Sequence, residues 1–443
     1  MERLILNNLL KWKESKYRKP LIVEGVRQVG KTWTLKEFGR LHYANTAYFN
    51  FDESPEYRQI FETTKDIERI LQNLSMTSGQ VITTHDTLII FDETQDCPEV
   101  INSLKYFYEN ANQYHVVCAG SLLGITLARP TSFPVGMVDF LKINPMTFTE
   151  FLFANGDDNL VAYLNSVDKI EAIPDAFYNP LCEKLKMYFI TGGMPEPVRL
   201  WTEERNVEQM QTALMNILGA YERDFAKHSA TKDFTKIAAV WQSLPSQLSR
   251  ENKKFLFKTV KPGARAREYE DAIQWLVGAG LVSKIFRNIT PGLPISAYDD
   301  LSAFKLYLAD VGLLRRLSML APSAINEGNR LFTEFKGALS ENYILQSLTN
   351  CFEVTPRYWA RDNPRYEIDF IIQHENEIIP IEVKSETNVE SASLKKYKEL
   401  FGEKTSLRVR FSMKNLELNG DLLNLPIFMA DHTERLMNLA LSK

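Results

Sequence analysis

The stretch "LIVEGVRQVGKT", residues 21–32, decides how the first part of this chain folds. Residues 25–32 fit the pattern G-x-x-x-x-G-K-[ST], in which a glycine-rich loop follows a strand and opens a helix. The apolar run before the loop predicts that strand. The backbone N–H groups of such a loop, together with the positive end of the helix, can surround phosphate groups. The stretch therefore predicts a loop that binds nucleotide phosphates, and the alternative is an ordinary glycine turn.

Individual side chains around this loop have expected roles. Lys31 is expected to reach the β- and γ-phosphates, and the hydroxyl of Thr32 is expected to bind Mg²⁺. Ser121 ends the apolar run "YHVVCAGS" and is a candidate sensor of the γ-phosphate; alternatively, it caps the next helix. No N-K-x-D sequence of the kind that recognises guanine occurs, so ATP is the expected nucleotide. The residues expected to line the nucleotide are Gly25, Val26, Arg27, Gln28, Val29, Gly30, Lys31, Thr32, Trp33 and Ser121.

A second apolar run, "TLIIFDET" at residues 87–94, completes the expected nucleotide site. Asp92 stands at the end of this run, where the acidic residue of a P-loop NTPase holds Mg²⁺ directly or through water. Glu93 follows and is expected to polarise the attacking water. Lys31 and Glu93 are therefore the candidate catalytic residues of a hydrolase, with Thr32 and Asp92 as metal ligands. The alternative is a strand whose first polar residues mark its end.

The bulk composition is that of a soluble globular protein with several domains. The chain has 443 residues, of which 44% are hydrophobic, and a formal net charge of -4. At roughly 150 residues per domain, this length predicts about three domains. Four cysteines without a CxxC pair, and scarce histidines, argue against a zinc site or a disulfide framework. A nucleic-acid partner would need a local basic patch, because the whole chain is slightly acidic.

The sequence shows no sign of export or membrane insertion. Its first 20 residues contain only short apolar runs broken by asparagine and lysine, unlike a signal peptide. No apolar run approaches the roughly 18 residues that a membrane-spanning helix needs. A reduced cytoplasmic location without membrane contact is therefore expected.

The order of apolar runs predicts an α/β fold. Up to about residue 200, the short runs "PLIVEG", "TAYFNF", "TLIIFDE" and "YHVVCAG" alternate with helical stretches. Strands separated by helices favour a parallel sheet with crossover helices. From about residue 205 to 290 the chain is mostly helical, and it ends this part in "REYEDAIQWLVGAGLVSKIF", a helix, a glycine break and a strand-like run.

A basic stretch lies in this middle part, "RENKKFLFKTVKPGARAR" at residues 250–267. A helix and a β-wing after such a stretch favour a winged-helix-like arrangement that faces a phosphate backbone. DNA is therefore a possible partner; a solvated face, or a module that binds protein, is the alternative. The seven basic residues, against the single acid Glu251, are Arg250, Lys253, Lys254, Lys258, Lys261, Arg265 and Arg267.

Near the C-terminus, "YEIDFIIQHENEIIPIEVKS" at residues 366–385 predicts a β-hairpin with "HENE" as its turn. Side chains alternate between the two faces of a strand. If Gln373 pairs with Ile378, Asp369 lies directly opposite Glu382, with Cβ atoms about 5 Å apart. Two such carboxylates repel, so the pair would have to bind a proton or share a cation.

A third acid, Glu341, is expected to join this pair. It lies on the apolar stripe of the helix in "FTEFKGALSENYILQSL", where an unpaired carboxylate is costly. An acid on a helix, an acid on a strand and E-x-K on the next strand resemble the PD-(D/E)xK nuclease fold. That resemblance implies Mg²⁺ on Glu341, Asp369 and Glu382, with Glu382 and Lys384 as candidate catalytic residues. The alternative is an inherited scaffold in which Glu382 and Lys384 form an ion pair.

The chain as a whole resembles the AAA-type ATPases of bacteria and archaea that carry a C-terminal domain of unknown function. Beyond the two nucleotide motifs, the segments that carry the resemblance are "AGSLLGI", "FPVGMVDFLKINPMTFTEFL", "YFITGGMPEPV", "YERDF", "YLADVGLL" and "GALSENYI…EIDFII…IEVKS". The resemblance implies a P-loop AAA-like ATPase domain at 1–204, a helical, winged-helix-like domain at 205–318 and a PD-(D/E)xK nuclease-like α/β domain at 319–443. Many relatives carry a basic residue where this chain has Met137; Arg223 is a substitute candidate for a trans-acting arginine, or else a surface ion-pair residue.

Two functions follow from these patterns. The first is an Mg²⁺-dependent ATPase whose nucleotide state controls a C-terminal half that binds or cuts nucleic acid. The second is a regulatory ATP-dependent switch whose C-terminal half binds a protein partner and cuts nothing. The patterns leave the biological process and the oligomeric state open.

Overall fold

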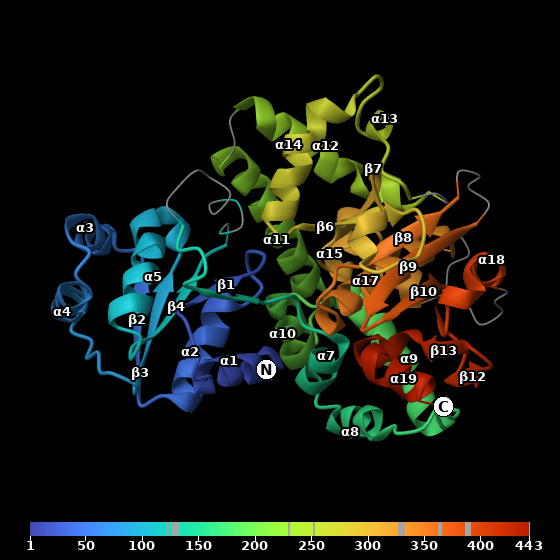
Figure 1. Cartoon of the computed structure of the whole chain (residues 1–443), viewed down its shortest axis with the longest axis horizontal. Helices are drawn as coiled ribbons and strands as arrows, with labels where there is room; N and C mark the ends of the chain where they lie inside the picture. Colours follow the sequence, from blue (N-terminus) through green and yellow to red (C-terminus); the bar gives the residue numbers. More distant parts are fainter. Residues whose placement is uncertain are drawn as a thin grey trace. The chain divides into compact units, whose positions relative to one another are not determined.

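The computed structural model describes residues 1–121, 123, 125, 133–228, 231–250, 253–326, 333–361, 366–385 and 391–442 (Figure 1). Contacts divide the chain into two compact units. The N-terminal unit holds residues 2–144 and 278–281, and the larger unit holds Met1, 145–277 and 282–443. The predicted boundaries at 204/205 and at 318/319 both lie inside the larger unit and stay predictions.

The N-terminal unit is built on a parallel sheet of five strands in the order β2-β3-β4-β1-β5 (Figure 1). The four strands predicted from the sequence are confirmed; the fifth, β5, was missed because it is a four-residue edge strand with half its residues exposed. The strands are β1 (Leu21–Glu24), β2 (Asn45–Asn50), β3 (Thr87–Asp92), β4 (His115–Ala119) and β5 (Asp139–Lys142). The helices are α1 (Ile5–Glu14), α2 (Lys31–His42), α3 (Pro55–Thr63), α4 (Ile67–Ser78) and α5 (Pro98–Asn110), with a short 3-10 turn η1 (Thr94–Asp96).

The interior strand β3 is buried along its whole length, which explains its unbroken apolar run. Phe91 of β3 contacts the rings of Phe49, Phe51 and Phe61 with centroids 5.4 to 5.9 Å apart. Helices α3, α4 and α5 pack against one another around this aromatic core. The buried core fixes β3, so the polar residues that follow Phe91 lie at the carboxyl edge of the sheet.

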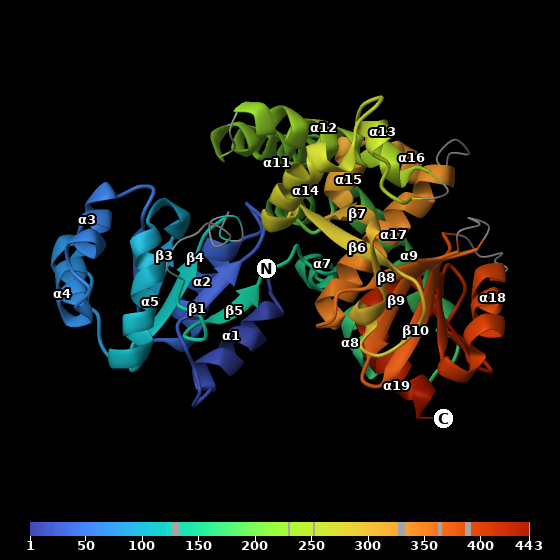
Figure 2. The ribbon, with the colours of Figure 1, turned by 45° about the horizontal axis from the view of Figure 1, so that its top comes forward.

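The larger unit combines a helical layer with a mixed sheet of eight strands in the order β12-β13-β11-β10-β9-β8-β6-β7 (Figure 2). Its first helices are α7 (Phe148–Ala154), α8 (Asp158–Ser166), α9 (Asp175–Thr191), α10 (Pro195–Glu204), α11 (Val207–His228), α12 (Thr231–Leu248), α13 (Phe257–Val260) and α14 (Ala266–Gly278). The strands are β6 (Val282–Asn288), β7 (Asp299–Leu308), β8 (Arg357–Ala360), β9 (Glu367–His374), β10 (Glu377–Val383), β11 (Arg408–Ser412), β12 (Glu417–Asn419) and β13 (Leu422–Pro426). The remaining helices are η2 (Ile295–Tyr298), α15 (Val311–Leu317), α16 (Pro322–Asn326), α17 (Thr333–Cys351), α18 (Ala392–Phe401), η4 (Gly402–Lys404), η5 (Ile427–His432) and α19 (Thr433–Leu441).

The predicted helix, glycine break and strand are α14, Gly280 and β6. Strands β6 and β7 form an antiparallel hairpin, as the predicted wing required. This hairpin is not free, because β6 also pairs with β8 through Arg287 and Asn288. The hairpin therefore extends the C-terminal sheet, and a separate winged-helix domain stays a proposal.

The segments that carry the family resemblance meet inside the larger unit. Asp310, from "YLADVGLL", accepts the backbone N–H of Gly193 at 2.6 Å and that of Leu313 at 2.9 Å. A Cβ on Gly192 would lie 2.2 Å from the Asp310 carboxylate, and a Cβ on Gly312 would lie 2.5 Å from the backbone N of Gly192. The two glycine positions therefore allow α9 and α15 to approach closely. Burial raises the pKa of Asp310 to about 6, although the backbone N–H groups that it accepts lower it.

Helix α17 joins the same region through amide side chains. Asn342 accepts the backbone N–H of Leu308 at 2.9 Å and donates to its carbonyl at 3.1 Å. Gln346 accepts the N–H of Val311 at 3.1 Å and donates to the hydroxyl of Tyr188 at 2.9 Å. These buried polar contacts connect α9, β7, α15 and α17, so Asn342 of the "GALSENYI" segment and Gln346 after it have structural roles.

Candidate functional site

The loop between β1 and α2 has the backbone geometry that its glycines predict. Gly25 has φ +149° and Gly30 has φ +91°, both in the region that favours glycine. A Cβ on Gly25 would lie 2.3 Å from the carbonyl oxygen of Ile143, so a larger residue does not fit. Gly30 is the residue directly before α2. The loop therefore ends at a helix N-terminus, where backbone N–H groups and the helix dipole favour a phosphate.

The ammonium group of Lys31 lies inside this loop. It donates to the carbonyls of Gly25 at 2.8 Å and Val26 at 3.0 Å. Burial lowers the pKa of Lys31 to about 8, although Glu93 and Asp92 oppose the shift. The charged form of a lysine that is desolvated in this way is stabilised by an approaching phosphate.

Thr32 and Asp92, the two residues predicted to bind Mg²⁺ at this loop, lie in contact, and their metal role stays a prediction. The Thr32 hydroxyl donates to Asp92 Oδ2 at 2.6 Å, and the hydroxyl of Tyr48 donates to the same oxygen at 3.0 Å. A hydroxyl and a carboxylate beside a phosphate loop are hard oxygen donors, the type that Mg²⁺ prefers. The residues present therefore fit a magnesium ion bound with a nucleotide.

Glu93 lies next to this pair with an uncommon backbone. Its φ of +53° places a non-glycine residue in the left-handed region, which turns the chain directly after β3. The carboxylate accepts a hydrogen bond from Gln95 Nε2 at 2.6 Å and a long one from the hydroxyl of Ser121 at 3.5 Å. Both predicted residues of this edge, Glu93 and Ser121, therefore face each other, and Gln95 holds the carboxylate between them.

Three contributors to this site were missed from the sequence: Arg3, Tyr48 and Gln95. Arg3 is 4% exposed and donates to the carbonyls of Val29 at 3.1 Å and Asn144 at 2.7 Å, so it fixes the backbone of the phosphate loop. The roles of Arg3 and Tyr48 come from contacts between segments distant in the sequence, which leave no local pattern. The one available signal was the polar residue Gln95, two residues after Glu93.

The remaining residues predicted to line the nucleotide divide into two groups. Val26 and Val29 are buried, so they can contribute only backbone groups to a ligand. Arg27, Gln28 and Trp33 are exposed. Their side chains are therefore accessible from solvent, and their contact with a nucleotide stays a prediction.

In the larger unit, the register of the predicted hairpin is confirmed. Strands β9 and β10 are antiparallel, and Gln373 pairs with Ile378. The turn is shorter than predicted, since only Glu375 and Asn376 separate the two strands. Asp369 accepts the backbone N–H of Val383 at 2.8 Å, which places it beside the end of β10 that carries Glu382.

Glu341 joins this region from α17, but lysines reach it first. It forms an ion pair with Lys253, and Tyr307 donates to its second oxygen at 3.1 Å. Burial alone would raise the pKa of Glu341, but Lys253 and Lys305 lower it below the usual value. A second ion pair, between Lys305 and Glu367, lies beside it. The carboxylate on the helix is therefore ionised and already neutralised by protein cations.

The two hairpin acids have different surroundings. Asp369 keeps some solvent exposure as a residue, yet burial of its carboxylate, with Glu341 nearby, raises its pKa to about 7. Glu382 is 2% exposed; one of its oxygens lies 3.1 Å from Lys384 Nζ, and the other has no hydrogen-bond partner. Arg410 of β11 lies directly across from Glu382 in the parallel pair. The predicted alternative, an ion pair between Glu382 and Lys384, is therefore present.

These surroundings do not fit a divalent metal ion. Within the described ranges, no group of three or more His, Cys, Asp or Glu side chains has an arrangement that could hold one. The acids Glu341, Glu367, Asp369 and Glu382 are matched in number by the bases Lys253, Lys305, Lys384 and Arg410. Lysines therefore already neutralise Glu341, Glu367 and Glu382, and a metal role for Glu341, Asp369 and Glu382 stays a prediction.

The basic stretch divides into an inner and an outer part. Lys253 points to Glu341, and Arg250 donates to the hydroxyl of Thr259 at 3.3 Å. Glu251 lies outside the described residues. Arg250 is itself exposed, and the other exposed basic residues, which lie on or beside α13 and the start of α14, are Lys258, Lys261, Arg265 and Arg267.

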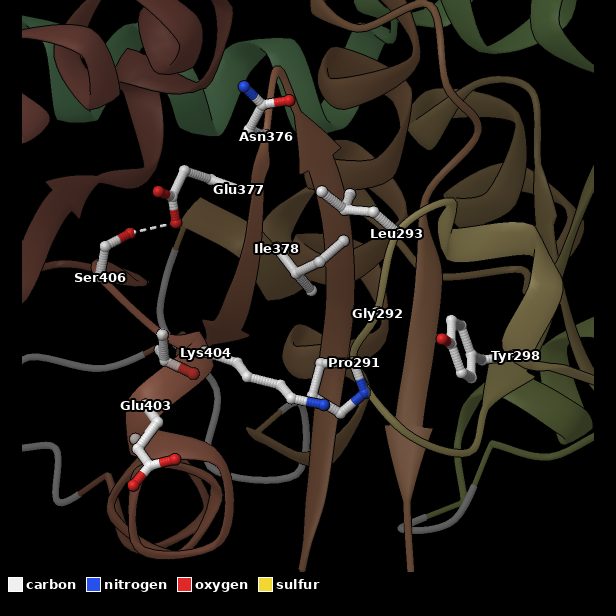
Figure 3. Close-up of a pocket in the computed structure, with 12 residues that line it drawn as sticks. Pro291, Gly292, Leu293, Tyr298, Asn376, Glu377, Ile378, Glu403, Lys404 and Ser406 are labelled. Carbon is white, nitrogen blue, oxygen red and sulfur yellow. Dashed lines mark hydrogen bonds between the residues drawn. The ribbon is translucent and has the colours of Figure 1, made fainter.

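A separate cavity of about 530 Å³ lies beside the hairpin turn (Figure 3). Ile378 of β10 lies beside Leu293 of the neighbouring loop, and Lys404 extends toward Pro291. Glu377 accepts a hydrogen bond from Ser406 across one side. None of the residues predicted from the sequence lines this cavity, so we do not assign it to the candidate site.

Loop, parallel sheet and acidic strand end together define a P-loop nucleotide-binding domain. Comparison with protein families agrees: residues 17–152 match the model described as an AAA domain. Residues 182–324 and 336–428 match models described as domains of unknown function, DUF8612 and DUF4143. Neither of these two indicates a nuclease or a winged helix. A search among curated proteins finds no match.

A comparison with solved structures finds several similar chains at low identity. The Walker-type ATPase PABY2304 of Pyrococcus abyssi is 13% identical over 71% of this chain and 95% of its own, with a TM-score of 0.44. The Aeropyrum pernix ORC1 protein in complex with DNA is 13% identical over 72% and 91%, with a TM-score of 0.24. AMPPCP-bound DnaA from Aquifex aeolicus is 14% identical over 62% and 86%, with a TM-score of 0.21. With TM-scores below 0.5, these similarities support no conclusion about this chain.

The helices were also compared with the requirements of a bilayer. Among the helices that the structure describes, none combines the length and the apolar character that crossing a membrane requires.

Proposed function

We propose that this chain is an Mg²⁺-dependent ATPase whose larger unit binds nucleic acid without cutting it. The observation that carries the first part is the convergence of Lys31, Thr32, Asp92 and Glu93 at one edge of the parallel sheet. A phosphate loop alone supports binding. An acid that approaches Thr32 within 2.6 Å, followed by a second acid, supports hydrolysis.

The roles of the chain's own residues follow from their positions. The loop N–H groups and Lys31 would hold the β- and γ-phosphates, and Thr32 and Asp92 would hold Mg²⁺, which neutralises charge on the phosphates. Glu93 would orient the attacking water and accept its proton. Gln95 holds the Glu93 carboxylate at 2.6 Å and acts as a positioning residue.

The second part of the proposal concerns the larger unit. Four exposed basic residues around α13 and α14 support contact with a phosphate backbone: Lys258, Lys261, Arg265 and Arg267. The lysines that already neutralise Glu341 and Glu367 favour a non-cleaving role over a nuclease. A protein partner remains the alternative for this unit, and Arg223, which is exposed on α11, stays a candidate for a trans-acting arginine.

The test is a phosphate-release assay with ATP and Mg²⁺. We expect Lys31→Ala to abolish nucleotide binding, and Glu93→Gln to keep binding while hydrolysis falls by roughly 100-fold or more, the range for loss of a general base. Glu109→Gln, at an exposed position on α5, is the matched control and should hydrolyse like the wild type. A wild-type chain that binds no ATP would overturn the proposal.

A further inference from the structure

Tyr48 brings a second hydroxyl to the carboxylate of Asp92. Tyr48 belongs to β2, the edge strand beside β3, and its side chain reaches along the sheet, since Asn50 is the residue that pairs with Asp92. The Tyr48 hydroxyl donates to Asp92 Oδ2 at 3.0 Å, the same oxygen that accepts the Thr32 hydroxyl at 2.6 Å. The other oxygen, Oδ1, accepts the backbone N–H of Glu93 at 3.0 Å. The carboxylate is therefore held from the helix after the phosphate loop, from the neighbouring strand and from its own chain.

The backbone of Tyr48 is fixed on the outer side of the sheet. An edge strand presents N–H and C=O groups that no further strand pairs. Here the side-chain amide of Gln80 takes the place of a strand: it accepts the N–H of Tyr48 at 2.8 Å and donates to its carbonyl at 3.0 Å. The backbone carbonyl of Gln80 in turn accepts the hydroxyl of Ser75 on α4 at 2.6 Å. Helix α4 therefore ties β2 at the residue whose hydroxyl reaches Asp92.

The ring and the hydroxyl of Tyr48 are fixed as well. The ammonium group of Lys36, one turn after Thr32 on α2, lies 3.5 Å from the centroid of the ring, within the range of a cation–π contact. Asn50 donates to the hydroxyl at a long 3.5 Å. Burial, together with the charge of Asp92, raises the pKa of Tyr48 well above its usual value. The hydroxyl therefore keeps its proton and remains a donor to Asp92.

We propose that Tyr48 is a positioning residue for Asp92, whose hydroxyl holds the carboxylate in the orientation that binds the Mg²⁺ of the nucleotide. Of the two hydroxyls on Asp92 Oδ2, that of Thr32 is itself an expected metal ligand, whereas that of Tyr48 acts only through the carboxylate. Loss of a group that orients a metal ligand typically lowers metal affinity by roughly 10- to 100-fold. The inference rests on the proposed ATPase function and adds to it a residue outside the two nucleotide motifs.

The experiment titrates the full chain with a fluorescent, non-hydrolysable ATP analogue, once with Mg²⁺ and once with EDTA. The ratio of the two affinities measures what the metal contributes to binding. We expect Tyr48→Phe to keep the metal-free affinity of the wild type and to lower this ratio by about tenfold. Tyr43→Phe is the matched control: its hydroxyl bonds His115 at 2.6 Å, and His115 begins β4 at the opposite edge of the parallel sheet from Asp92. The control should keep both affinities.

The metal-free titration separates a positioning role from a merely structural one. A Tyr48→Phe variant that also loses metal-free affinity would overturn the inference, because the hydroxyl would then support the fold of the whole site. An unchanged ratio in Tyr48→Phe, beside a wild type whose affinity rises with Mg²⁺, would overturn the inference and leave the proposed function intact. A wild type that binds no analogue would overturn both. The failure of the inference is therefore distinguishable from the failure of the proposed function.

Discussion

The Lys31 ammonium is the charged group of the phosphate loop whose protonation depends most on its surroundings. Burial lowers its pKa to about 8, whereas an exposed lysine titrates near 10.4. A bound phosphate would favour the charged form again. Nucleotide binding is therefore coupled to proton uptake whenever the free protein has lost this proton.

This coupling gives a pH dependence with a definite sign. Below pH 8 the free loop already carries its charge; above pH 8 binding must first protonate Lys31, so affinity for a non-hydrolysable ATP analogue should fall by about tenfold between pH 7 and 9. Isothermal titration calorimetry in buffers of different ionisation enthalpy measures both affinity and proton uptake.

Lys31→Arg is the matched control for this prediction. Arginine stays charged over the whole range, so any binding it retains should lack the pH dependence. An affinity of the wild type that is flat from pH 7 to 9 would show that the lysine is fully charged in the free loop.

The residues of the N-terminal site differ in how well sequence predicts them. Lys31 and Thr32 belong to one motif, and the strand that carries Asp92 is a clear apolar run, so their proximity follows from the parallel sheet. Gln95 acts through a contact that depends on the turn after β3, and Arg3 acts through a hydrogen bond from the N-terminal segment to the loop. Such contacts are decided by tertiary packing and have no periodicity to detect.

At the scale of elements, the contact between the end of α9 and the start of α15 organises the larger unit. Asp310 satisfies two backbone N–H groups, from Gly193 and Leu313, in a fully buried position. The sequence marked "YFITGGMPEPV" and "YLADVGLL" as features of the resemblance but offered no reason for them. The reason is steric and polar at once: the glycines allow the approach, and the aspartate pairs the groups that the approach buries.

Removal of this carboxylate should therefore destabilise the protein. We expect Asp310→Ala to lower the free energy of unfolding by about 2–4 kcal/mol, because it leaves two buried donors unpaired and removes a helix N-cap. Asp66→Ala removes an exposed N-cap aspartate of α4 and should cost about 1 kcal/mol or less. Urea unfolding of both variants measures the difference, and equal losses would contradict the role given to Asp310.

The exposed basic elements, α13 and the start of α14, allow a separate prediction about nucleic acid. Loss of each phosphate contact lowers the salt dependence of binding by roughly 0.9 in the log–log slope. Arg265→Ala/Arg267→Ala should therefore reduce both the affinity for duplex DNA and this slope, by about 1–2. Fluorescence anisotropy across a salt series measures it, with Lys395→Ala/Lys404→Ala as a control that removes two charges near α18. Equal slopes in the two double variants would remove this surface from the proposal.

At the scale of the whole molecule, the sequence predicted whether a segment forms a helix or a strand better than it predicted which sheet a strand joins. The parallel sheet, the C-terminal hairpin with its register, and helices α17 and α18 were predicted correctly. The extension of the C-terminal sheet by β6 and β7 was not, because β6 and β8 join through only two residue pairs far apart in the sequence. The ion pair of Lys253 with Glu341 was not predicted for the same reason, since nothing in a basic stretch indicates which of its lysines the fold directs inward.

The measurement that tests the central claim most directly is one reaction that contains the wild-type chain, ATP, Mg²⁺ and supercoiled plasmid, followed for phosphate release and for plasmid integrity. We predict that phosphate accumulates, that it does not in the Lys31→Ala variant, and that the plasmid stays supercoiled. A plasmid that is nicked by the wild type but not by Glu382→Ala/Lys384→Ala would contradict the account, because the acid cluster would then cut DNA despite its lysines.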